Sequence, residues 1–110
     1  MKFSEINLTG QSREQLKTEI FFSVASERAS GVEVVRFNIT PKDEDFTARA
    51  FTHSVRILKG MKENRAVQFL ATPQSFENSE REASFLINKY PELFSDFTAN
   101  SDVPYIYVKI

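Results

Sequence analysis

The chain contains no cysteine, no tryptophan and a single histidine among its 110 residues. Without cysteine there can be no disulfide, no thiol catalysis and no thiolate metal site. The lone histidine, His53, has no second imidazole with which to bind a metal ion or share acid–base chemistry. We therefore expect no metal ion and no cofactor. The scarcity of catalytic groups favours a non-enzymatic protein and leaves an enzyme open.

Long hydrophobic runs and an excess of either charge are also missing. No apolar run approaches the roughly 18 residues of a membrane-spanning helix, and the opening MKFSEINL lacks the apolar core of a signal peptide. The net charge is -1, so no global field draws the chain onto nucleic acid or an anionic membrane. We expect a cytoplasmic protein without membrane association, in which any nucleic-acid contact comes from a local patch.

Apolar residues, by contrast, are abundant. They make up 41% of the chain and include 11 phenylalanines, which suffices for a packed interior and is too many for a disordered chain. A length of 110 residues suits one core and not two. We expect a single domain over residues 1–110.

The first forty residues have the pattern of a βαβ unit. Residues 3–9 alternate as in a strand, and Gly10 interrupts the alternation. Ser12 and Gln15 have capping-box spacing, and apolar residues then recur at helical spacing until Gly31. The following stretch, VEVVRFNI, is apolar on both parities, which is typical of a parallel strand covered on both faces.

The rest of the chain continues the alternation of helices and strands. Asp43 or Asp45 can cap a second, mostly buried helix, and residues 66–71 form a third strand. The pattern of residues 79–90 predicts a third helix, and that of residues 103–110 predicts a half-exposed last strand near a sheet edge. The predicted fold is α/β, in the order β-α-β-α-β-α-β, with a mostly parallel four-stranded sheet covered by three helices.

The stretch LTGQS stands where a strand end meets a helix N-terminus. Ligands of open parallel sheets gather at such places, and helix N-termini attract anions. Thr9, Gly10, Gln11 and Ser12 are therefore a candidate anion-binding site. The alternative is a helix cap without a ligand, because one glycine is neither a dinucleotide fingerprint nor a P-loop.

Two further groups of side chains could make contacts with a partner. Basic residues fall on the arc of the second helix opposite its apolar residues, and could contact phosphates or form an ordinary solvated face. They are Arg49, Arg56, Lys59 and Lys62. Tyr105 and Tyr107 alternate away from the apolar residues of the last strand, so they could form a dimer contact or lie under a helix.

The stretch INLTGQSREQL resembles the opening of the Smr (small MutS-related) domain, in which Asp-Leu-His-Gly precedes an amphipathic helix. The strands VEVVRFNI and YIYVKI are also similar to that family's α/β pattern. Asn7 stands in place of the family's Asp and Thr9 in place of its His, and no Gly-Lys-Gly-type loop follows Ile39. The resemblance implies a nucleic-acid-binding domain, and the changed motif positions predict that it lacks nuclease activity.

These observations lead to two hypotheses of function. The first is a non-enzymatic binding or assembly module that engages a protein partner or itself. The alternative is a divergent Smr-like domain that binds nucleic acid through the basic helix face. Affinity for RNA or DNA that falls steeply with salt would distinguish the second from the first.

Overall fold

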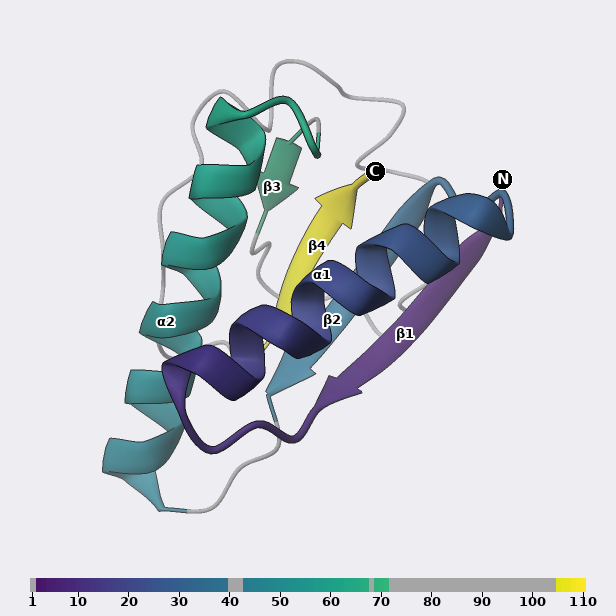
Figure 1. The fold of residues 1–110 in the computed structure, drawn as a ribbon. Coiled ribbons are helices and arrows are strands. Elements are labelled where there is room, and N and C mark those ends of the chain that lie inside the picture. Colours follow the sequence, from purple (N-terminus) through teal and green to yellow (C-terminus); the bar gives the residue numbers. More distant parts are fainter. Residues whose placement is uncertain (1, 40–42, 68, 72–104) are drawn as a thin grey trace.

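The fold was analysed in a computed structural model, which describes residues 2–39, 43–67, 69–71 and 105–110. The elements, in chain order, are β1 (Phe3–Leu8), α1 (Arg13–Ala29), β2 (Val34–Ile39), α2 (Glu44–Glu63), β3 (Phe69–Ala71) and β4 (Tyr105–Lys109), as shown in Figure 1. The helix predicted at residues 79–90 lies outside the described residues.

The sheet is four-stranded and mixed, with the strand order β1-β2-β4-β3. β1 and β2 are parallel, whereas β4 is antiparallel to both of its neighbours, β2 and β3. The prediction of a mostly parallel sheet covered by three helices is therefore wrong, since only the β1–β2 pairing is parallel among the strands that the structure describes. The alternation of apolar and polar residues in β4 is typical of antiparallel strands, and it was the feature that the predicted topology failed to use.

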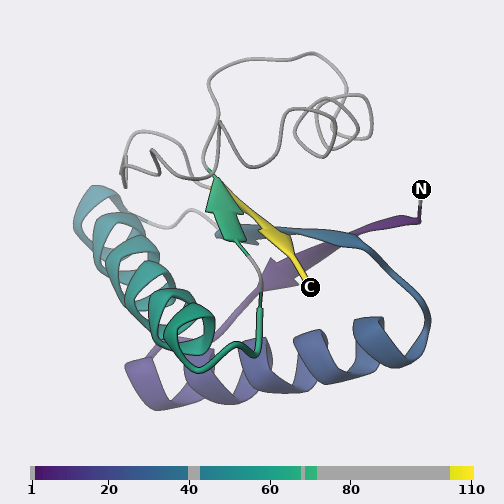
Figure 2. The ribbon, with the colours of Figure 1, turned by 90° about the horizontal axis from the view of Figure 1, so that it is seen from above.

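Both helices cover the same face of the sheet (Figure 2). Residues of one parity on the strands point at the helices and form the core with the buried side of α1 and α2. The strand residues of this core are Leu8, Val35, Phe37, Ile39, Ile106 and Val108, and the helix residues include Leu16, Ile20, Val24, Phe51, Val55, Leu58 and Met61. Val34 is also buried but lies on the opposite face, so β2 is covered on both faces as predicted.

The first helix begins and ends as the sequence predicts. Ser12 is the N-cap of α1, and its Oγ accepts a hydrogen bond of 3.2 Å from the Gln15 N–H. At the other end Gly31 adopts a φ of 80°, and the N–H groups of Gly31 and Val32 bond back to Arg28 and Glu27. This is the Schellman motif that glycine favours. The cap and the stop position α1 across the parallel pair β1–β2.

The second helix begins at a carboxylate cap, because Asp43 Oδ1 accepts a 2.8 Å hydrogen bond from the Phe46 N–H. Of the two predicted caps, Asp43 is thus the one used. The helix ends in the same motif as α1, with the Ala66 N–H bonded to the Met61 carbonyl. Arg65 takes the left-handed position there, with a φ of 60°.

Candidate functional site

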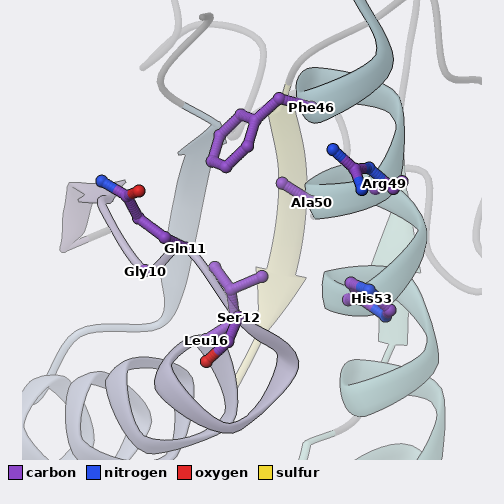
Figure 3. Close-up of a pocket in the computed structure, with 8 residues that line it drawn as sticks. All are labelled: Gly10, Gln11, Ser12, Leu16, Phe46, Arg49, Ala50 and His53. Carbon is purple, nitrogen blue, oxygen red and sulfur yellow. The ribbon is translucent and has the colours of Figure 1, made fainter.

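A small cleft separates the loop before α1 from the first turns of α2 (Figure 3). It encloses about 100 Å³ and lies at the end of the sheet where β1 and β2 finish. Its walls come from the two helices and the loop, and are formed by Gly10, Gln11, Ser12, Leu16, Phe46, Arg49, Ala50 and His53. The loop and one member of the predicted basic stripe, Arg49, thus meet in one place.

The Gly10 turn already holds a carboxylate from the same chain. The side chain of Glu19, on the second turn of α1, accepts hydrogen bonds from the Thr9 N–H at 3.0 and 3.1 Å and from the Thr9 hydroxyl at 3.1 Å. It also accepts one from the Gly10 N–H. An external anion at this turn would have to displace Glu19, so the donors at Thr9 and Gly10 act as a structural clamp.

The remaining two residues of the predicted site serve the start of α1. The Gln11 N–H donates to Gln15 Oε1 at 2.8 Å, and Ser12 Oγ receives the Gln15 N–H described above. The side chains of Ser12 and Gln15 thus each accept a backbone N–H, as in a capping box. The N–H that Gln15 accepts belongs to Gln11, one residue before the N-cap. The Ser12 hydroxyl hydrogen is still available to donate into the cleft that this residue lines.

Replacing Glu19 with glutamine should lower the free energy of unfolding by about 1 to 2 kcal/mol. The amide keeps one acceptor oxygen, loses the charge and places an NH₂ donor where Oε2 accepts from the Thr9 N–H and hydroxyl. Chemical denaturation followed by circular dichroism measures the change. Glu14→Gln is the matched control, since its side chain lies on the exposed side of α1. Equal stabilities of the two variants would contradict the clamp.

The charged groups that line the cleft are basic. Arg49 is exposed, and its Nε makes only a long hydrogen bond of 3.4 Å to the Asp45 carbonyl. It forms no ion pair with any described residue. His53 is partly buried, and its Nδ1 is buried without a hydrogen-bond partner. None of the lining residues is acidic, so the cleft suits an anion and not a cation.

The predicted basic stripe is exposed along α2. Arg49, Arg56, Lys59 and Lys62 are all exposed, and Arg56 and Lys62 form no ion pair within the described part of the chain. The stripe runs from the cleft towards the C-terminal end of α2, because its residues follow one another at intervals of seven and three residues. Arg49, Arg56 and Lys62 are thus exposed cations that a partner can reach.

A second row of basic residues runs along α1. The Arg28 guanidinium donates to the carbonyl of Ala66, just after α2, so this side of α1 faces α2. Arg13 and Lys17 share that side by helical spacing, and both are exposed. Lys17 Nζ lies 5.6 Å from the ring centre of Phe21, which is 43% exposed. The second row and its aromatic ring were not predicted from the sequence.

The two tyrosines do not lie at a sheet edge. β4 is paired on both sides, and Tyr107 is completely buried, so the prediction of an edge strand is wrong. The Arg36 guanidinium stacks on the Tyr105 ring at 3.9 Å and donates to the Tyr107 hydroxyl at 3.4 Å. The Arg36 Nε also lies 3.7 Å from Glu5 Oε1. These contacts tie the tyrosines into the protein's own sheet.

Comparison of the chain with protein-family models, curated proteins and solved structures finds no match. Among the residues that the structure describes, no helix is long and apolar enough to cross a membrane. Within the same ranges, no group of three or more His, Asp or Glu side chains is placed to hold a metal ion. The interpretation of the site therefore depends on its geometry and charge.

Proposed function

We propose that the chain is a non-enzymatic cytoplasmic module that binds RNA or DNA through the outer surface of α1 and α2. The observation that carries this proposal is the exposed basic stripe of α2, in which Arg49, Arg56 and Lys62 have no carboxylate partner among the described residues. Unpaired, exposed cations along a helix are the groups that contact phosphates without reading bases. The row of cations on the neighbouring side of α1 widens the same surface.

The distribution of charge supports a polyanionic partner despite the near-neutral total. Residues 72–104 contain six acidic and two basic residues, whereas the chain as a whole has a net charge of -1. The remainder of the chain therefore carries an excess of three positive charges. A local basic surface can attract nucleic acid where the net charge of the chain does not.

The contacts of the other predicted sites weigh against the first hypothesis. It depended on the Gly10 turn and on Tyr105 and Tyr107, and these groups bond within the molecule. The basic stripe is the predicted surface that remains exposed. A divergent Smr-like ancestry and the lack of nuclease activity stay predictions, and the Thr9 hydroxyl, at the position of the family histidine, donates to Glu19.

The proposal predicts that removal of two stripe charges weakens binding of labelled oligonucleotides about tenfold, because each lost phosphate contact contributes to affinity. The variant is Arg56→Gln with Lys62→Gln, measured by fluorescence anisotropy on single- and double-stranded RNA and DNA. Lys2→Gln with Lys109→Gln removes the same charge outside the stripe on α2 and should leave the affinity within about twofold. Equal losses in the two variants, or no binding by the native chain, would refute the proposal.

A second candidate function is association with a protein partner or with a second copy. Phe22 is 74% exposed and Phe21, beside it on α1, is 43% exposed. Large exposed aromatic side chains are common at protein interfaces. Light scattering over a dilution series is expected to show a dimer that Phe22→Ser abolishes if this candidate is correct. A monomer at every concentration would exclude self-association through this surface.

A further inference from the structure

We propose that the cleft between the start of α1 and α2 binds one phosphate group of the bound nucleic-acid strand, with Arg49 as its charged contact. The inference deepens the proposed function and rests on it. The basic stripe begins at this cleft, since Arg49 belongs to both. A strand lying along α2 would therefore bring a phosphate to the cleft.

Arg49 has the hydrogen-bonding capacity that a phosphate needs. Its Nε is directed at the Asp45 carbonyl over 3.4 Å, and no described residue accepts from its two terminal amino groups. A guanidinium whose terminal groups are available binds phosphate oxygens through paired N–H donors. The lack of an acidic neighbour in the cleft leaves its charge uncompensated.

His53 supplies a second donor. The residue lines the cleft, and its buried Nδ1 has no hydrogen-bond partner. An imidazole always carries at least one ring N–H, so this side chain can donate to an oxygen of a bound phosphate. Ser12 lines the opposite wall and adds a hydroxyl group that can donate.

The volume of the cleft limits the size of the group that it can hold. Ligand pockets for whole small molecules usually enclose about 300 Å³ or more, whereas this cleft encloses about 100 Å³. The cleft is therefore suited to a small group such as one phosphate and not to a whole nucleotide. The neighbouring Gly10 donors do not contribute, because the Glu19 carboxylate occupies them.

The phosphate-binding site is tested directly by titrating the isotopically labelled chain with inorganic phosphate and recording nuclear magnetic resonance spectra. We expect saturable shifts of the Ser12 and Arg13 amides and of the His53 ring, and none with chloride at equal ionic strength. Arg49→Gln should weaken phosphate binding at least about tenfold, while Arg56→Gln, one stripe position away, should change it less than about twofold. Shifts that spread along both helices without saturating, alike in the two variants, would overturn the inference.

Oligonucleotides with and without a 5′-phosphate separate the two sources of the group. A gain in affinity from the 5′-phosphate that Arg49→Gln abolishes supports a terminal phosphate, and equal affinities with a loss in Arg49→Gln support a backbone phosphate. If oligonucleotides bind and the Arg49→Gln variant binds them with the affinity of the native chain, the phosphate site in the cleft is refuted and the proposed function stands. If inorganic phosphate binds and no oligonucleotide does, the proposed function fails, and with it the assignment of the phosphate to a strand.

Discussion

Replacing Tyr107 with alanine is expected to lower the free energy of unfolding by about 3 to 5 kcal/mol. The side chain is completely buried on an internal strand, which makes it one of the largest fully buried groups among the described residues. Its ring stacks on Phe3 with centroids 6.4 Å apart and meets the Tyr105 ring edge-on at 5.8 Å. Truncation removes these contacts and leaves a cavity that the sheet cannot close.

The loss is measured by urea denaturation, with Tyr107→Phe as the matched comparison. Phenylalanine keeps the ring and removes only the hydroxyl that accepts from Arg36, so it should cost no more than about 1.5 kcal/mol. A stability loss below about 1 kcal/mol for Tyr107→Ala would mean that Tyr107 is not buried. For the same reason Tyr107→Glu is expected to unfold the domain.

Replacing Gly10 with alanine should destabilise the protein by about 2 to 3 kcal/mol, because the turn has no room for a methyl group. A Cβ at this position would lie 2.7 Å from the Glu19 Oε1, 2.8 Å from the Leu16 nitrogen and 3.0 Å from the Gln15 carbonyl carbon. The carboxylate could move aside, but the two backbone atoms belong to the first turn of α1. The substitution therefore disturbs both the clamp and the helix start.

Gly60 provides the matched control for this prediction. It lies inside α2, and a Cβ there would meet nothing within 4 Å. Alanine is a better helix former than glycine, so Gly60→Ala should stabilise the domain by about 0.5 to 1 kcal/mol. The same substitution is thus expected to have opposite effects at the two glycines, which differential scanning calorimetry can measure. A stabilising Gly10→Ala would contradict the close approach seen at the turn.

Local signals in the sequence predicted the parallel half of the fold. The Ser12 cap, the Gly31 stop and the two-sided apolar pattern of VEVVRFNI each involve neighbours along the chain, and each is confirmed. Such features depend on backbone donors and on strand periodicity, which a short stretch of sequence specifies by itself.

Features that depend on long-range pairing were not predicted. The direction of β4 depends on which strands it pairs with, and the strand inserts between β2 and β3 although it is last in the chain. The clamp was also missed, because Glu19 is nine residues from Gly10 along the chain. The only signal for it was its position between Leu16 and Ile20, at the border of the apolar side of α1. A carboxylate at such a border can reach either solvent or the loop, and the sequence alone does not distinguish them.

The basic surface was predicted in part for a similar reason. Spacing along one helix placed Arg49, Arg56, Lys59 and Lys62 on one arc of α2, and the structure exposes all four. How α1 packs beside α2 cannot be derived from either helix, so the row with Arg13 and Lys17 emerged only from the fold.

The most direct test of binding through the helical surface is the salt dependence of affinity for duplex DNA or RNA. The logarithm of the association constant should fall linearly with the logarithm of the salt concentration between about 50 and 200 mM, with a slope proportional to the number of phosphates neutralised. For the variant with Arg56→Gln and Lys62→Gln we expect a slope shallower by about 2 than that of the native chain, and for Lys2→Gln with Lys109→Gln an unchanged slope. Identical slopes for the native chain and the stripe variant would contradict it.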